Sequence, residues 1–330
     1  MYMNLKTVCL ALFACCLTGC AGQAGLLGFG VLSTQDRNDY RHARDLFNAG
    51  NYQAAVADLS NYIYKTRNVR RREVRAYRLL GQSYEHLGNL SSALETYLEA
   101  LEFHPKDVPL LLAAATLYNR TGLTDRAIEL YERALQLEPS NQNVLAGLGE
   151  VYVKTGFYSK ARGYYEKLFA QYPQAAAVHR ARYAASFYQQ KDFANAFIHI
   201  TLALEQEPEN ADFWLLSAKA QRGLNRLTEA LNDLDLALLL APEREDLQAY
   251  RALWLHQAGQ YDASDQTARY ILARYPENEL ARFVLAMNAS ARGQHGEAKK
   301  YLAQIRADDK DTFIHRFALA LQNPPAKKAP

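Results

Sequence analysis

Apolar side chains recur along this chain at spacings of three and four residues, in paired segments joined by short polar turns. The clearest example is the segment 74–107, in which Tyr77, Leu80 and Tyr84 share one face of a first predicted helix. A second amphipathic helix follows. Pro105 ends it, because proline has no backbone N–H to donate and clashes with the preceding turn. The pattern therefore predicts two helices joined by a tight turn.

Small residues occupy the positions where these two helices would cross. Gly81 lies in the first helix, and Ala93 and Ala100 lie in the second. Larger side chains there would hold the helices apart, so these positions predict a close crossing. Gly88 and Leu90 mark the turn between the two helices.

This spacing resembles the tetratricopeptide repeat (TPR), a helix–turn–helix unit of about 34 residues. The spacing returns along the chain, and six units have proline at position 32. The resemblance implies an all-α fold, a right-handed α-solenoid of about eight TPR units with a C-terminal capping helix. The predicted array spans 36–312, with repeats at 36–69, 74–107, 108–141, 142–175, 177–210, 211–244, 245–278 and 279–312.

Two repeats depart from the family pattern at the turn, where Lys191 and Asn225 replace the usual glycine. Asparagine tolerates the left-handed backbone that glycine would otherwise supply. After the last repeat, we expect residues 313–322 to form the capping helix, because each repeat buries its apolar face only against a neighbour. The Pro-rich segment 323–330 is predicted to be a disordered tail.

The N-terminus has the form of a secretory signal peptide over residues 1–19, with one lysine followed by an apolar run. The run ends in Leu-Thr-Gly-Cys20, which resembles the lipobox of bacterial lipoproteins and implies a lipidated Cys20. An ordinary signal peptide or a short membrane anchor is the alternative. All four cysteines lie within the first twenty residues, so the folded body has no disulfide framework and suits an oxidising compartment.

Residues 20–35 are predicted to be the lipidated cysteine and a Gly-rich tether, although their apolar side chains could instead lie at the lipid surface or cover the first repeat. Ala21 follows the cysteine, and in diderm lipoproteins such a residue favours the outer membrane. We therefore expect a lipid-anchored protein of the bacterial cell envelope that faces the periplasm. Inner-membrane retention stays open.

Composition and motifs argue against several function classes. The formal net charge of +3 gives no reason to expect nucleic acid as a partner. The sequence contains no nucleophile elbow, zinc-protease motif or phosphate-binding loop, and the eight histidines are scattered. The sequence therefore predicts no enzyme, no cofactor and no metal site.

In TPR proteins the first helix of each unit lines the concave face, mainly through unit positions 2, 5, 9, 12 and 13. The resemblance implies that partners bind there. On this chain these positions include Arg37, Tyr40, Arg44, Asn48, Arg75, Arg78, Gln82, Asn119, Arg120, Asn143, Lys154, Lys219 and Arg222. They also include Phe47, Glu85, His86, Leu112, Thr116, Glu150 and Asp212.

The N-terminal end of this face is basic, and a basic insert with Arg70, Arg71 and Arg72 precedes the second repeat. Arginine forks bind carboxylates and phosphates through two hydrogen bonds, so this end suits an acidic partner segment or phosphate groups near a membrane. A solvated loop and helix face is the alternative interpretation. The C-terminal end is apolar and has Leu280, Phe283, Met287 and Ser290. It is either the seam under the capping helix or a groove for an amphipathic helix.

The favoured function is a non-enzymatic scaffold that holds partner proteins at the periplasmic side of the outer membrane. TPR lipoproteins of this type take part in envelope assembly, secretion and pilus systems, and the sequence does not choose among these. Direct binding of glycan or anionic lipid phosphate through the Arg-rich end is the alternative function.

Overall fold

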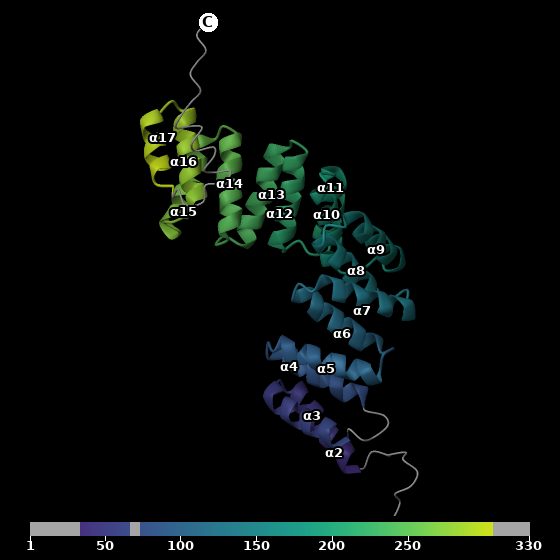
Figure 1. The fold of residues 1–330 in the computed structure, drawn as a ribbon. Helices are drawn as coiled ribbons and strands as arrows, with labels where there is room; N and C mark the ends of the chain where they lie inside the picture. Colours follow the sequence, from purple (N-terminus) through teal and green to yellow (C-terminus); the bar gives the residue numbers. More distant parts are fainter. Residues whose placement is uncertain (1–33, 67–72, 306–330) are drawn as a thin grey trace, which may run out of the picture. The chain divides into compact units, whose positions relative to one another are not determined.

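The computed structural model describes residues 34–66 and 73–305, and every regular element among them is an α-helix (Figure 1). The helices form eight consecutive pairs. The pairs are α2 (Thr34–Asn48) with α3 (Tyr52–Thr66), α4 (Val74–His86) with α5 (Leu90–Phe103), α6 (Val108–Arg120) with α7 (Thr124–Leu137), α8 (Gln142–Lys154) with α9 (Tyr158–Gln171), α10 (Ala177–Gln189) with α11 (Phe193–Leu204), α12 (Ala211–Gly223) with α13 (Leu227–Leu240), α14 (Glu245–Gln257) with α15 (Tyr261–Arg274), and α16 (Glu279–Ala291) with α17 (His295–Ala303).

The prediction of an all-α repeat fold is confirmed. From the second repeat to the eighth, the first helix begins at the residue where the predicted repeat begins. Helix α2 begins at Thr34, two residues before the predicted array and inside the segment 20–35 that was expected to be a tether. The signal peptide 1–19, Cys20, the capping helix 313–322 and the tail 323–330 lie outside the described residues, as do Arg70, Arg71 and Arg72.

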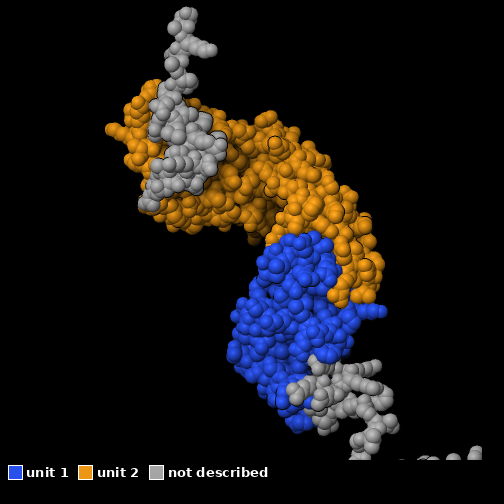
Figure 2. Space-filling model, viewed as in Figure 1, with its two compact units in different colours: residues 1–130 blue, residues 131–330 orange. Residues whose placement is uncertain are grey.

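The chain divides into two compact units (Figure 2). Unit 1 comprises residues 1–130, and unit 2 comprises residues 131–330, so the division falls within α7. Within each unit the helices stack in chain order. In unit 1, α3 packs between α2 and α4, and α5 packs between α4 and α6. In unit 2, each helix from α9 to α16 likewise contacts the helix before it and the helix after it.

First helices of neighbouring repeats also contact each other. In unit 1 this holds for α2 and α4. In unit 2 it holds for α8 and α10, for α10 and α12, and for α14 and α16. Each unit therefore has one surface built from first helices, the first-helix face, and another built from second helices, the second-helix face. The first-helix face carries the positions at which the sequence predicted partner binding.

The crossing within a helix pair depends on a large ring packed against a residue without a side chain. In the second repeat, Tyr97 of α5 is 1% exposed and its ring lies over Gly81 of α4. A Cβ atom on Gly81 would lie 2.1 Å from Cε1 of Tyr97, well inside van der Waals contact. Ala93 and Ala100 are fully buried beside this contact, as their predicted place at the crossing requires.

The turns between paired helices use a left-handed backbone. Six glycines have positive φ at these turns, and Lys191 and Asn225 take the same conformation with φ of 62°. The expectation that Asn225 would replace a left-handed glycine is confirmed. None of the six turn glycines has an atom within 4 Å of the place where a Cβ would stand. The backbone conformation, and not space, therefore favours glycine there.

We predict that Gly81→Ala destabilises the second repeat by roughly 1–3 kcal/mol, because the added methyl group must push Tyr97 off its place. The urea midpoint measured by circular dichroism should fall. Gly163→Ala in α9 is the matched control, since a Cβ there meets nothing within 4 Å. It should be neutral or stabilising by up to about 1 kcal/mol. Equal midpoints for wild type and Gly81→Ala would show that the crossing tolerates a wider separation.

Candidate functional site

Positively charged side chains gather around Tyr40 on the first-helix face of unit 1. Burial, and next the carboxylate of Glu73, raise the pKa of the Tyr40 hydroxyl. The positive charges of Arg75, Arg44 and Arg78 act in the opposite direction and lower that pKa. Three guanidinium groups from α2 and α4 are therefore close enough to act on one hydroxyl. We call Tyr40, Arg44, Arg75 and Arg78 the basic cluster.

The members of the basic cluster differ in how far their charge is already compensated. Arg44 forms an ion pair with its exposed neighbour Asp45 at 3.2 Å. Arg78 lies 3.7 Å from one carboxylate oxygen of Asp107. The other oxygen of Asp107 accepts a hydrogen bond from the backbone N–H of Leu110 in the first turn of α6. Arg75 is exposed and forms no ion pair within the described part of the chain. The Arg44 pair is exposed and therefore weak, the Arg78 pair is partly buried, and Glu73 also acts on Tyr40, so the positive charge of the cluster is offset only in part.

A groove beside the basic cluster brings together predicted binding positions from the first three repeats. It has a volume of about 480 Å³ and is lined by Phe47, Gln82, Glu85, His86 and Arg120. His86 stacks on Tyr52 with ring centroids 4.2 Å apart and an interplanar angle of 2°. Phe47, whose ring also contacts that of His86, completes an aromatic wall of the groove beside polar side chains.

Glu85 has a structural role in this groove. Its carboxylate accepts a hydrogen bond of 2.7 Å from the buried Tyr97 hydroxyl. Burial, followed by this hydrogen bond and the charge of Glu85, raises the pKa of Tyr97 far above the ordinary tyrosine value. The other oxygen of Glu85 lies 3.5 Å from Arg120. Glu85, which the sequence analysis placed on the binding face, therefore also fixes the Tyr97 ring. That ring packs between α4 and α5.

Two residues at the predicted positions are buried. Asn119 is 5% exposed, since it follows the fully buried Leu111 and Ala115 at steps of four residues along α6 and shares their buried side. Phe283 is 2% exposed and packs against Leu302 of α17 inside the last helix pair. The assignment of binding residues by unit position does not take into account that a side chain at the edge of the first-helix face can point into the core.

The remaining predicted residues lie at the surface, without forming one cluster. Arg37 and Asn48 are exposed in unit 1, and Asn143 and Lys154 are exposed in unit 2. In unit 2, the Lys219 ammonium lies 4.6 Å from the centre of the Tyr250 ring. Arg222 donates two hydrogen bonds, of 3.0 and 2.7 Å, to the side-chain oxygen of Gln257.

An apolar groove on the first-helix face of unit 2 was missed by the sequence analysis. It lies between α14 and α16, has a volume of about 470 Å³, and is lined mainly by Ala249, Tyr250, Leu253 and Leu280. Ala249 and Leu253 occupy unit positions 5 and 9 of the seventh repeat, so the position rule would have found them. The predicted apolar end therefore extends to the seventh repeat, although Phe283 does not belong to its surface.

The described residues contain no group of three or more His, Cys, Asp or Glu side chains that could hold a metal ion. Within the same residues, no helix is both long enough and apolar enough to cross a membrane. The prediction that the protein is not an enzyme stays a prediction.

The stacked helix pairs define a helical-repeat protein. Comparison with known families identifies the type of repeat. Two family models, both described as tetratricopeptide repeat, match residues 40–108 and 120–183. Both matched segments are tetratricopeptide repeats, and such repeats imply a scaffold for protein–protein interactions.

Solved structures share this fold at low sequence identity. A TPR protein from Parabacteroides merdae is 17% identical, with a TM-score of 0.60 over 78% of this chain and 99% of its own. PilF of Pseudomonas aeruginosa is 17% identical, with a TM-score of 0.55 over 64% and 96%. PilW, a type IV pilus biogenesis factor, is 16% identical, with a TM-score of 0.51 over 74% and 98%. No curated protein matches the sequence.

We predict that Glu85→Ala lowers the stability of unit 1 by roughly 1–3 kcal/mol, because the buried Tyr97 hydroxyl loses its acceptor. Urea unfolding followed by circular dichroism measures the change. Glu85→Gln keeps an acceptor and should cost less. Arg120→Ala is the control for the ion pair and should change stability by less than about 1 kcal/mol, since the Arg120 side chain is exposed and the pair is 3.5 Å long. If Arg120→Ala is as damaging as Glu85→Ala, the ion pair and not the buried hydroxyl is the important contact.

Proposed function

We propose that this TPR protein is a scaffold of the bacterial cell envelope, anchored to the outer membrane by lipid on Cys20 and facing the periplasm. In this proposal the basic cluster binds an acidic segment of a partner protein. Arg44 of α2 and Arg75 and Arg78 of α4 lie on two packed first helices and all act on the Tyr40 hydroxyl, and this arrangement carries the proposal.

The chemistry of the basic cluster favours a carboxylate-bearing peptide. A guanidinium group can donate two parallel hydrogen bonds to a carboxylate. Arg44 and Arg75 are exposed, so a partner's carboxylate can reach them. The adjoining groove adds the rings of Phe47 and His86, against which apolar side chains of the same peptide can pack. An acidic segment with an apolar or aromatic residue beside its carboxylates fits both parts.

The membrane anchor rests on the sequence. Residues 17–20 read Leu-Thr-Gly-Cys at the end of an apolar run, which is the arrangement that lipoprotein signal peptides have. More than one acyl chain gives stable membrane attachment where a single chain is marginal. Ala21 after the cysteine supports the outer membrane in preference to the inner membrane.

A role in pilus assembly or secretion is supported by fold likeness only. PilW is a type IV pilus biogenesis factor and shares the arrangement of helix pairs with this chain. An envelope-anchored TPR array is suited to such systems because it offers an extended surface to a partner while the lipid fixes its place.

Binding of phosphate groups, from a glycan or an anionic lipid, is the second candidate, because arginine forks suit phosphate as well as carboxylate. The two functions differ in ligand type and in salt dependence. Binding that depends on charge alone weakens steeply as salt shortens the Debye length. Peptide binding that also packs side chains into the groove keeps part of its affinity.

We predict that Arg44→Glu/Arg75→Glu/Arg78→Glu removes the main protein partners from pull-downs of solubilised envelope, and weakens binding of a Glu-rich peptide at least roughly tenfold. Arg226→Glu/Lys299→Glu/Lys300→Glu is the matched control, with the same charge change at exposed sites of unit 2. Fluorescence anisotropy gives the affinities, with vesicles containing anionic lipid as a parallel probe. Unchanged partners in the basic-cluster variant would contradict the proposal. Loss of vesicle binding only would favour the phosphate function.

A second prediction concerns the anchor. Cys20→Ser should abolish incorporation of labelled palmitate and shift the protein from the outer-membrane fraction to the soluble fraction, or leave it as an unprocessed precursor. Metabolic labelling and membrane fractionation measure both results. Cys16→Ser is the control, because it lies within the predicted signal peptide and should still permit lipidation. Palmitate labelling that persists in Cys20→Ser would place the lipid elsewhere.

A further inference from the structure

The apolar groove on the first-helix face of unit 2 lies between α14 and α16, which contact each other. Ala249, Tyr250 and Leu253 of α14 line it together with Leu280 of α16. The side chains of Leu253 and Leu280 are only partly buried, so the groove keeps apolar surface that a ligand can cover. Because removing apolar surface from water is favourable, the groove suits an apolar ligand.

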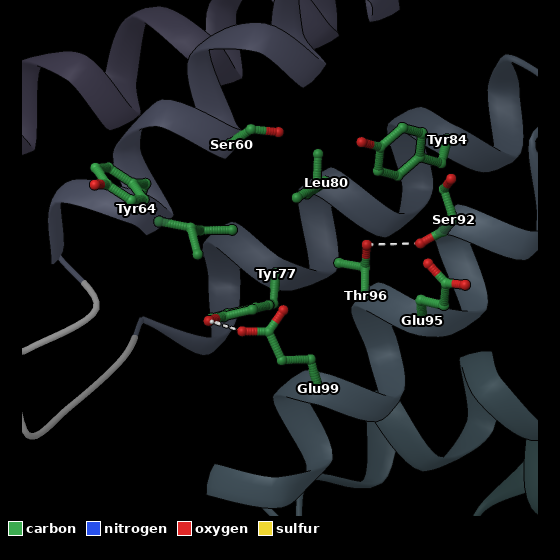
Figure 3. Close-up of a pocket in the computed structure, with 10 residues that line it drawn as sticks. Ser60, Tyr64, Tyr77, Leu80, Tyr84, Ser92, Glu95, Thr96 and Glu99 are labelled. Atoms are coloured by element: carbon green, nitrogen blue, oxygen red, sulfur yellow. Dashed lines mark hydrogen bonds between the residues drawn. The ribbon is translucent and has the colours of Figure 1, made fainter.

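A pocket on the second-helix face of unit 1 differs from this groove in chemistry (Figure 3). Hydroxyl and carboxylate groups make up much of its lining. Thr96 donates a hydrogen bond of 2.7 Å to the backbone oxygen of Ser92, and Tyr77 donates one of 3.1 Å to Glu99. Covering polar groups with an apolar surface costs free energy. A helix that packs through apolar side chains therefore suits the groove between α14 and α16 better than this pocket.

The described part of the chain ends close to the apolar groove. Helix α17 has nine residues, whereas the other second helices have 12 to 15. Just after α17, the backbone oxygen of Gln304 accepts a hydrogen bond of 3.3 Å from Arg282 of α16. Ile305 packs against the core cluster of the last helix pair, and so does Leu280, which also lines the groove. The chain thus leaves α17 beside the helix that forms one wall of the groove.

Residues 306–330, which follow the described chain, contain one strongly apolar stretch. Residues 313–321 read Phe-Ile-His-Arg-Phe-Ala-Leu-Ala-Leu. Side chains four residues apart share one face of a helix, so Phe313, Phe317 and Leu321 form an apolar stripe on the helix that the sequence predicts there. A helix this short is marginal in water by itself, and it becomes stable only when a surface covers its stripe.

The connecting residues 306–312 are long enough to bring this stretch to the groove. Seven extended residues reach up to roughly 23–25 Å. The axes of two packed helices lie only about 8–10 Å apart. Since α16 itself forms one wall of the groove, a segment that starts at α17 has to pass only this one helix.

The charges of the groove and the segment are complementary. Glu245 and Asp246 are exposed and line the groove. Asp246 pairs with Arg244 at 2.8 Å, whereas Glu245 forms no ion pair within the described part of the chain. Arg316 comes three residues after Phe313, so it lies at the edge of the apolar stripe. An exposed pair between this arginine and Glu245 adds a small contribution to the apolar contact.

We propose that residues 313–321 of this chain dock as an amphipathic helix in the groove between α14 and α16. Phe313 and Phe317 enter the groove and pack against Leu253 and Leu280. The segment then occupies the apolar end of the first-helix face, and a partner helix that binds there has to displace it. A capping helix stacked on α17 differs from this arrangement, because it leaves the groove open. The inference does not depend on the proposed function, which rests on the basic cluster of unit 1.

Hydrogen exchange of the full chain, followed by mass spectrometry, tests the docking. We expect the amides of 313–321 to exchange at least roughly tenfold more slowly than in a synthetic peptide of residues 311–323, because the undocked helix is marginal. Ala249→Arg puts bulk and positive charge into the groove and should restore the rate of the peptide. Ala273→Arg is the matched control, since Ala273 is exposed on α15 and does not line the groove.

Three results of this experiment would overturn the inference. The first is exchange of 313–321 in the wild type at the rate of the peptide. The second is slow exchange that persists in Ala249→Arg, which would place the segment elsewhere, as a cap on α17 does. The third is slow exchange that appears only at high protein concentration, which would make a second copy of the chain the occupant.

A second measurement decides the question if Ala249→Arg does not fold. The 311–323 peptide carries fluorescein, and its anisotropy is followed during titration with the wild type and with Phe313→Asp/Phe317→Asp. The double variant cannot fill its own groove and should bind the peptide at least roughly tenfold more tightly, because the attached segment of the wild type competes at high effective concentration. Equal affinities of the two chains would contradict the docking.

Discussion

The close approach of two helices, with a tyrosine ring against a bare backbone, is the contact on which the rest of this fold depends. Tyr97 over Gly81 fixes how near α5 lies to α4, and the fully buried Ala93 and Ala100 permit that distance. Unit 2 repeats the arrangement with Tyr165 of α9 over Gly149 of α8, and Phe193 of α11 lies over Gly223 of α12 in a similar contact between neighbouring pairs. Because each pair is locked internally, its outward side chains are free to vary. Arg44 and Arg75 of the basic cluster are such outward side chains.

Much of the fold could be predicted from the sequence because the information is local. The returning period sets helix length, turn and crossing within each pair, and these involve residues fewer than about 34 positions apart. Surface sites were harder to predict. Asn119 and Phe283 follow the position rule and yet turn into the core, since a helix face has no sharp margin and the neighbouring packing decides which side chains are covered. The groove lined by Tyr250 and Leu253 follows the same rule and could have been found.

The basic cluster shows a different limit of sequence reasoning. Arg44 comes from α2, whereas Arg75 and Arg78 come from α4. Only the packing of these two helices brings their charges to act on Tyr40.

The left-handed turns have a consequence for how stability is distributed along the array. Lysine and asparagine adopt this backbone at Lys191 and Asn225, and the turn glycines have open space where a side chain would stand. A residue other than glycine at the turn destabilises the folded state by about 1–2 kcal/mol through conformational strain. It also lowers the conformational entropy of the unfolded chain, which stabilises the fold by about 0.4–1 kcal/mol. Neither term alters the packed crossing. The residue at each turn can therefore set the free energy of local unfolding of its own helix pair. Helix pairs with the same packed core can then differ in how readily they fray.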